Sequence, residues 1–424
     1  MTASTGPARQ PGSGPGPGAR DAAGGRLRVG WWFALEPVGA DAVAWSLIRV
    51  DDLPPDGPVG AGLLTGVRQL RTFAASMLPI DPPDRTASPP QESAGSGGLW
   101  TGPLTDYEAE RWAAVRLGQG LLPDVLRDEL LAADLSAVRH TVTVACRGWL
   151  AQVPWEVLAL DMVGDVRLVE RARVAAGLSP TVNAGRRRAP QQRPGAPALL
   201  VLDPGPRGQD GFRGSLGEHK PLYPGGIPLD WDEALDHDDQ IVPDRGTLGA
   251  DRLGELLRSQ VGWSRLLYFG HCLPGSADTP AGAALLLSTP NGEERFTAHA
   301  WLGDPQRWPC PARVALIACG SDDAVQLEQS GLPVAAVNAG AELLTVTRWT
   351  LPVGTERSRH EAVTALALAV DAAHREEDAL TAIGRWQCER LAAWRAGGAI
   401  IDSPLLWGAL ATYLVPPARL EPAP

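Results

Sequence analysis

Two residues with reactive side chains each follow a short apolar segment. The run at 265–269 (RLLYF) leads through one glycine to His271, and the run at 313–318 (RVALIA) leads directly to Cys319. In open parallel sheets, functional sites form beyond the carboxyl ends of the strands. Because 48 residues separate His271 from Cys319, a strand–crossover–strand unit can bring both to one sheet edge. A cysteine beside a histidine supplies a nucleophile and its base, since imidazole accepts the thiol proton and the thiolate attacks.

The residue after the cysteine suits the same chemistry. Gly320 leaves the backbone free to turn and to present an N–H group to a developing oxyanion. Each reactive residue alone also has a structural explanation, because cysteine is among the most buried residue types and a histidine after an apolar strand is commonly part of the core. The residues alone leave both interpretations open.

Short apolar runs without alternation are typical of strands in a parallel sheet buried on both faces. Such runs lie at 198–202, 265–269, 313–318 and 342–347. Segments with helical spacing of apolar residues lie between and after them, at 248–258, 324–338 and 358–396, the last long enough for two helices. The sequence therefore predicts an α/β fold with a mainly parallel sheet flanked by helices.

The first part of the chain has a different pattern. Residues 1–26 hold seven glycines and four prolines and read as a disordered tail. A small N-terminal α+β region is predicted for 27–112, ahead of the main domain. The elements expected in and just after this region are a strand pair at 28–35 and 42–50, a helix at 62–77, two helices within 105–133 and a strand at 140–145.

Composition excludes several classes of function. Lys220 is the only lysine, and its neighbours His219 and Pro221 do not form the Gly-Lys-Ser/Thr of a phosphate-binding loop. The net charge of −11 argues against nucleic acid as the main partner. The five cysteines include no CxxC pair, and their odd number argues against a disulfide framework. We therefore expect no cofactor, no metal and no nucleic acid partner.

The chain also lacks the marks of membrane insertion or secretion. No apolar run approaches 18 residues, and residues 1–26 have no apolar segment of the kind found in signal peptides. A cytoplasmic protein without membrane contact is expected. The preference for arginine over lysine, with abundant Ala, Gly and Pro, points to a GC-rich bacterial genome.

Five segments, in order along the chain, resemble the motifs of CHAT domains, which belong to the caspase-like clan of cysteine peptidases with separase and gingipain. Residues 266–271 (LLYFGH) resemble the family's "HFACHG", and 314–320 (VALIACG) resemble "LVLSACETG". Residues 331–349 are similar to "GLARAFLAAGARSVVASLW", 149–158 to "LxxLPWExL", and 403–407 to the closing "HPxxWAAF". The resemblance covers roughly residues 113–416.

The resemblance implies a cysteine endopeptidase that acts on a protein or peptide and is gated by an activating protein partner in a bacterial regulatory or defence system. Cys319 would be the nucleophile and His271 the general base. The backbone N–H groups of Cys272 and Gly320 would form the oxyanion hole, although the family has glycine where this chain has Cys272.

The substrate pocket departs from the family pattern. The "WPVDD" acids that would follow Trp349 are missing, which puts a preference for a basic P1 residue in doubt. Asp322 and Asp323, just after the predicted nucleophile, and Asp203, at the end of the run at 198–202, are the candidate acids of the pocket. Acids at the start of a helix also serve as partners of the helix dipole, and that explanation stays open for Asp322 and Asp323.

Two other functions remain as alternatives. One is a CHAT-like scaffold or interaction protein that keeps the fold without the chemistry, which the substitution at Cys272 motivates. The other is a different α/β enzyme, such as a transferase that uses the cysteine.

Two polar segments are predicted to be loops. The acidic stretch at 230–239 could bind calcium but lacks the spacing of an EF-hand, so a solvated loop is the simpler interpretation. The segment 180–197, with three arginines at 186–188, is expected to be exposed and open to cleavage, including by the protein itself.

Overall fold

The computed structural model describes most of the chain between residues 27 and 415. The described residues are 27–50, 58–77, 102–135, 138–179, 182, 186–187, 189, 196–204, 212–214, 217–219, 240–241, 248–273, 275, 280–318, 321–322, 331–351 and 357–415.

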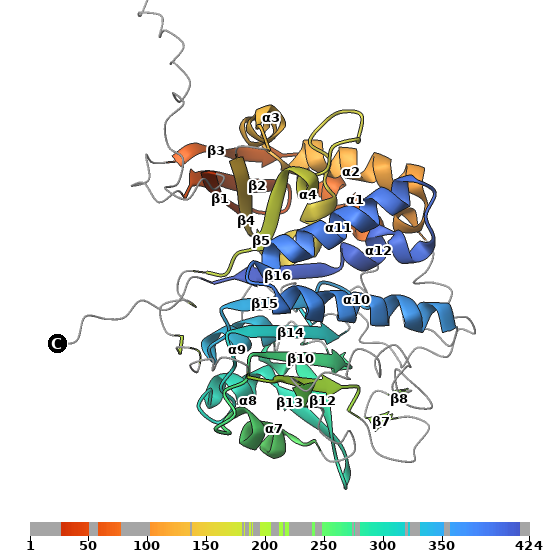
Figure 1. The fold of residues 1–424 in the computed structure, drawn as a ribbon. Helices are drawn as coiled ribbons and strands as arrows, with labels where there is room; N and C mark the ends of the chain where they lie inside the picture. Colours follow the sequence, from red (N-terminus) through yellow and green to blue (C-terminus); the bar gives the residue numbers. More distant parts are fainter. Residues whose placement is uncertain are drawn as a thin grey trace, which may run out of the picture.

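One large sheet organises the described part of the chain (Figure 1). Its eleven strands lie in the order β3-β2-β1-β4-β5-β16-β15-β14-β10-β6-β9. Their bounds are β1 Leu27–Pro37, β2 Ala42–Arg49, β3 Pro58–Thr65, β4 Val138–Ala145, β5 Ala172–Ala176, β6 Ala198–Leu202, β9 Gln240–Ile241, β10 Arg265–Gly270, β14 Arg313–Ala318, β15 Leu343–Thr347 and β16 Leu410–Leu414. Only the β1–β2, β2–β3 and β15–β16 pairs are antiparallel, which confirms the predicted mainly parallel sheet.

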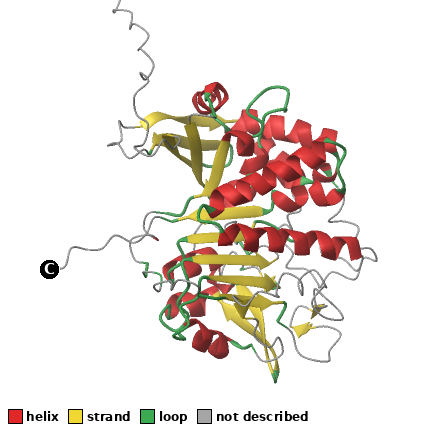
Figure 2. Ribbon diagram, viewed as in Figure 1, coloured by secondary structure: helices red, strands yellow, loops and turns green. Residues whose placement is uncertain are grey.

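The four apolar runs form parallel strands that are buried on both faces, because the crossovers between parallel strands place helices on the sheet. Every residue of β6, β10 and β15 is buried, as is all of β14 after Arg313. Alternate residues enter two different cores: Leu267 and Phe269 join the cluster that includes α10 (Arg357–Arg375), whereas Leu266 and Tyr268 join the cluster with α7 (Ala250–Leu257) and α9 (Leu332–Asn338). Figures 1 and 2 show these helices on opposite faces of the sheet.

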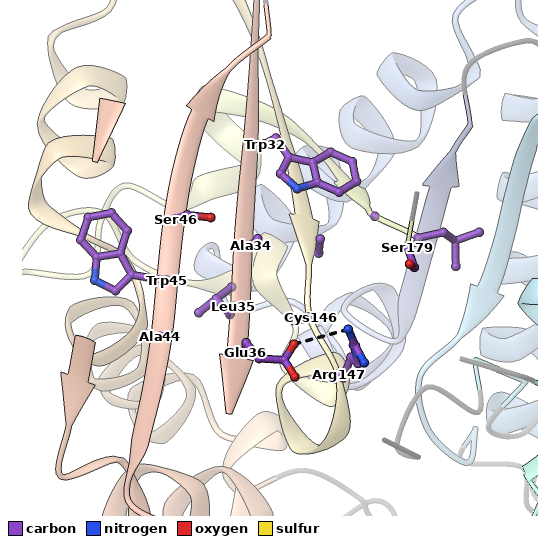
Figure 3. A pocket seen from close by; sticks show the side chains of 13 residues that line it. Trp32, Ala34, Leu35, Glu36, Ala44, Trp45, Ser46, Cys146, Arg147 and Ser179 are labelled. Carbon is purple, nitrogen blue, oxygen red and sulfur yellow. Dashed lines mark ion pairs between the residues drawn. The ribbon is translucent and has the colours of Figure 1, made fainter. Parts of the chain in front are cut away.

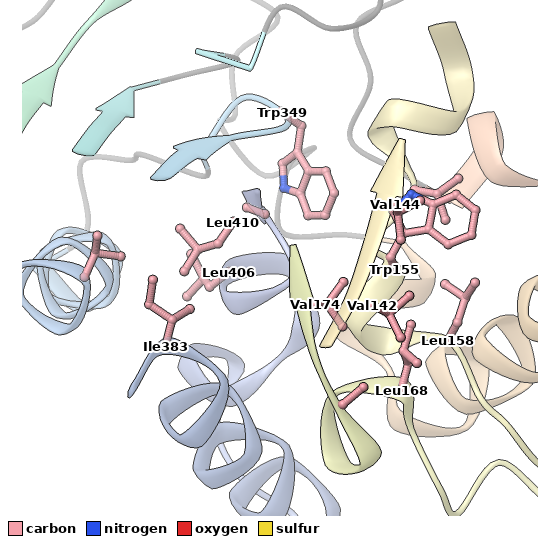
Figure 4. Packing of buried hydrophobic residues seen from close by; sticks show 14 of the residues in the cluster. Val142, Val144, Trp155, Leu158, Leu168, Val174, Trp349, Ile383, Leu406 and Leu410 are labelled. Carbon is pink, nitrogen blue, oxygen red and sulfur yellow. The ribbon is translucent and has the colours of Figure 1, made fainter. Parts of the chain in front are cut away.

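The first of these cores continues beneath the N-terminal strands. Trp155 packs there with Val142 and Val144 of β4, and Leu406 and Trp349 extend it toward the C-terminal elements (Figure 4). β1 pairs in parallel with β4, so the N-terminal strands extend the same sheet. The boundary predicted between residues 112 and 113 stays a prediction.

The helices around this core follow the predicted positions. The pair expected within 105–133 is α2 (Tyr107–Leu121) and α3 (Asp124–Ala132). The pair expected within 358–396 is α10 and α11 (Ala379–Arg395), and α11 begins at Asp378, whose side chain accepts a hydrogen bond from the Thr381 N–H. An N-cap residue stabilises a helix in this way, because its side chain accepts a hydrogen bond from an N–H group that has no partner within the helix.

The helix predicted at 62–77 is wrong in its first part. Residues through Thr65 form β3, and only Val67–Met77 form a helix, α1. Gly62 permits this strand to pair with β2, because a β-carbon there would lie 2.8 Å from the indole nitrogen of Trp45, its partner in the register. Gly66, with φ +73°, then turns the chain into the helix.

The crossover between β10 and β14 holds a small second sheet that the sequence did not predict. It consists of β11 (Cys272–Leu273), β12 (Ala284–Thr289) and β13 (Gly292–Thr297) and leads into helix α8 (Ala298–Gly303). His271 is therefore the single residue between a strand of the large sheet and a strand of the small one.

The loop that holds the three arginines at 186–188 was predicted to be exposed, and its first two arginines are not fully exposed. Arg186 and Arg187 are half-buried, and the Arg187 N–H donates to the Asn338 carbonyl at 3.0 Å. Arg188 and the acidic stretch at 230–239 lie outside the described residues. Among the helices that the structure describes, none combines the length and apolarity needed to cross a membrane.

A buried ion pair fastens the strand that leads to His271. Arg265, at the start of β10, donates to Asp371 of α10 through Nε at 2.7 Å and Nη2 at 3.1 Å. Asp371→Asn should lower the free energy of unfolding by about 3–5 kcal/mol, because the buried guanidinium loses its counter-charge. Glu255→Gln, in an exposed pair with Arg252, should change it by no more than about 0.5 kcal/mol. Urea unfolding of both variants checks this, and equal losses would contradict it.

Candidate active site

The two strands that lead to the predicted dyad are neighbours in the sheet. β10 and β14 run parallel, and their register pairs Gly270 with Ala318, the last residue of each strand. His271 is the next residue after the first, and Cys319 is the next after the second. Cys319 and Gly320 lie outside the described residues, so the dyad itself stays a prediction.

The main chain of His271 is held by hydrogen bonds. Its carbonyl oxygen accepts from the Leu286 N–H of β12 at 3.0 Å and from the hydroxyl of Tyr268 at 2.7 Å. The side chain of His271 is half-buried. A half-buried imidazole on a fixed backbone, beside the end of a neighbouring strand, can exchange protons with a group held there.

Cys272 directs its side chain into the protein. The residue is buried, pairs with Leu285 across β11 and β12, and belongs to the apolar cluster of α7 and α9. Its β-carbon and thiol are therefore accommodated by the core. The predicted role of its backbone N–H in an oxyanion hole is untested.

Asp203 lies at the end of the strand on the other side of β10. β6 pairs in parallel with β10, and Asp203 follows its last residue with φ +41°, in the left-handed region that aspartate tolerates better than most residues. Its N–H donates to the Phe269 carbonyl at 2.5 Å, and the residue is only 1% exposed. The three strand ends β6, β10 and β14 thus bring Asp203 and His271 to the edge that Cys319 follows.

Asp322 is tied into the sheet. Its N–H donates to the Thr347 carbonyl at 2.9 Å, and its carboxylate accepts from the hydroxyl of Tyr413 on β16 at 2.5 Å. The residue is 4% exposed, and burial raises the pKa of its carboxyl to about 6, although the Tyr413 hydrogen bond and Arg348 act to lower it. Asp323 lies outside the described residues.

A buried ion pair joins two of the segments that carry the family resemblance, and its arginine also contacts the residue that follows a third. Arg348 at the end of β15 bonds both carboxylate oxygens of Glu156, at 2.8 and 3.0 Å, and Glu156 lies in the short helix Trp155–Val157. The same guanidinium donates to the Gly408 carbonyl at 2.9 Å. The sequence resemblance includes Glu156 and Arg348, but it did not single them out as partners.

A separate pocket of about 310 Å³ lies on the N-terminal strands, between Trp32, Trp45 and the Glu36–Arg147 ion pair (Figure 3). It sits at the carboxyl ends of β1, β4 and β5. These strands run opposite to β10 and β14, because β16 is parallel to β5 and antiparallel to β15. The pocket therefore lies at the edge of the sheet away from His271.

Comparison with known proteins identifies the family. The sequence model of the CHAT domain matches residues 113–380, more than half of the chain. The protein belongs to the CHAT domain family. No curated protein matches the sequence.

A solved structure shows a similar fold. A chain of a Saccharomyces cerevisiae separase–securin complex superposes with a TM-score of 0.50 at 8% identity, over 92% of this chain and 30% of that one. A second structure of that complex gives a TM-score of 0.36 at 11% identity, over 65% and 16%. The CHAT protein thus spans less than a third of the first matching chain, and the predicted caspase-like fold is confirmed.

The raised pKa of Asp322 predicts a pH-dependent stability. Because its pKa of about 6 in the folded protein exceeds the ordinary value of 3.8, the folded state binds the proton more tightly. This contribution to the free energy of unfolding is complete below about pH 4 and is lost as the pH rises through 6. Asp322→Asn should remove that part of the slope. Urea unfolding between pH 4 and 7.5 measures it, and identical slopes in the two proteins would contradict the assignment.

Proposed function

We propose that this CHAT protein is a cysteine endopeptidase with Cys319 as nucleophile and His271 as general base. The observation that carries the proposal is the parallel register of β10 and β14, which pairs the residues that precede His271 and Cys319. A Cys–His pair at adjacent strand ends is the arrangement that nucleophilic catalysis needs.

The reaction follows from these roles. His271 takes the thiol proton, and the Cys319 sulfur attacks the peptide carbonyl carbon to form a tetrahedral oxyanion. The oxyanion collapses as the C–N bond breaks, and the imidazolium gives its proton to the departing amine. Water, deprotonated by His271, then hydrolyses the thioester and regenerates the thiol. The backbone N–H groups of Cys272 and Gly320 are the proposed oxyanion donors.

The proposed acids of the substrate pocket are Asp203, Asp322 and Asp323. The carboxylate of Asp322 accepts a hydrogen bond from the hydroxyl of Tyr413 inside the protein. Asp203 supports the proposed pocket by its place, because it follows the last residue of β6 at the edge of the sheet that carries His271.

A protein partner is proposed to control the activity. The separase of the matching structure is in complex with securin, and by analogy this chain would pair with a protein in a bacterial regulatory or defence system. The proposed location is the cytoplasm. The alternative, a non-catalytic scaffold, is favoured by one observation, that Cys272 stands where the family has glycine and packs into the core.

The dyad is tested with a peptidyl electrophile that labels catalytic thiols. The wild-type protein should be labelled at Cys319. Cys319→Ala and His271→Ala should each lower labelling and peptide cleavage by about a thousandfold or more, and the double variant should be little worse than either, because nucleophile and base act as one unit. Cys388→Ala removes a half-buried thiol of α11 and should leave both readouts unchanged.

Two results would contradict the proposal. Loss of activity in Cys272→Ala with retention in Cys319→Ala would show that the wrong thiol was chosen. A folded protein that neither reacts at Cys319 nor cleaves peptides, even when purified with its partner, would support the scaffold.

A further inference from the structure

Tyr268 is the one aromatic residue of β10 that carries a hydroxyl group, and this hydroxyl contacts a residue beyond the end of the strand. The side chain is 1% exposed and belongs to the apolar cluster of α7 and α9. Its hydroxyl donates to the His271 carbonyl, three residues further along, at 2.7 Å. It also lies 2.7 Å from the Leu286 carbonyl of β12.

These contacts close a small network around the backbone of His271. The Leu286 N–H donates to the same His271 carbonyl at 3.0 Å. One hydroxyl thus joins the end of β10, the main chain of His271 and the first long strand of the small sheet. A catalytic base must be held to within a fraction of an ångström, and buried hydrogen bonds to its main chain hold it in that way.

Gly270 makes room for the hydroxyl. A β-carbon at this position would lie 2.9 Å from the Tyr268 oxygen, 3.0 Å from the ring carbon that bears it and 3.2 Å from Pro204. The hydroxyl of Tyr268 and the absence of a side chain at Gly270 therefore form a matched pair.

We propose that Tyr268 is a positioning residue for His271, and that Gly270 precedes the histidine because it admits the tyrosine hydroxyl. The inference rests on the proposed function, since it assigns Tyr268 a role in the reaction of the dyad. The hydroxyl acts through the backbone of His271 and does not touch the substrate.

The hydroxyl is suited to a permanent structural role. Burial raises the pKa of Tyr268 well above its ordinary value, and the neighbouring Cys272 and Asp203 raise it further. The tyrosine therefore stays protonated and remains a donor over the pH range in which a thiol–imidazole pair works.

The test uses the pH dependence of Cys319 alkylation by iodoacetamide, located by mass spectrometry, with kcat and KM for a cleaved peptide. In the wild type the midpoint of Cys319 alkylation should lie below the pKa of about 8.5 of a free cysteine. Tyr268→Phe should move it upward by about one unit or more and lower kcat about tenfold or more, with little change in KM. Tyr107→Phe removes a hydroxyl from α2 and should change neither.

A double-variant cycle separates positioning from simple loss of stability. If Tyr268 acts through His271, the variant Tyr268→Phe/His271→Ala should be no worse than His271→Ala alone. Gly270→Ala supplies a second route, because displacing the hydroxyl should reproduce the shifted midpoint. Adding Tyr268→Phe to Gly270→Ala should cost less stability than the sum of the two single changes.

The possible failures are distinct. If His271→Ala leaves the midpoint of Cys319 alkylation at its wild-type value, the proposed dyad and this inference are both wrong. If the midpoint of Cys319 alkylation depends on His271 but is the same in Tyr268→Phe, the inference alone is wrong. The inference is also wrong if Tyr268→Phe has the same effects in the His271→Ala background as in the wild type.

Discussion

The parallel pairing of β10 with β14 is the constraint on which the site depends. It fixes Gly270 opposite Ala318, and so sets where the chain leaves each strand. Side chains alternate between two cores along these strands, so a slip of one residue would exchange the two faces and disrupt both cores at once. The register is therefore specified by burial over the whole of each strand. The position of His271 follows from it.

Buried polar contacts then fasten the segments that the register brings together. Arg265 fixes the start of β10 to α10 through Asp371, and Tyr268 fixes its far end to the main chain of His271. Arg348 fixes the end of β15 to Glu156 and to the chain before β16. Removing one member of such a pair is costly, because the other is left buried without its partner. The apolar cores hold the layers together, and these contacts determine how the strand ends lie.

The sequence predicted the parts of the fold that one short segment determines by itself. The runs at 198–202, 265–269, 313–318 and 342–347 are strands because a run of apolar residues without alternation fits a sheet covered on both faces. β3 was missed, because Leu63, Leu64 and Leu70 also fit a helical period, and the fit of Gly60 and Gly62 against Trp45 of the neighbouring strand depends on tertiary packing. The predicted dyad is consistent with the strand register. Tyr268 was not singled out, because its partner carbonyls belong to the residue between β10 and β11 and to the β12–β13 hairpin, which local pattern does not specify.

The central claim is that the ends of β10 and β14 place His271 and Cys319 in one cleft. An experimental structure of the protein carrying a peptidyl electrophile bonded to Cys319 tests it most directly. The sulfur and the nearest ring nitrogen of His271 should face each other within hydrogen-bond reach, directly or through one water. A label on another residue, or the two side chains on opposite faces of the sheet, would contradict it.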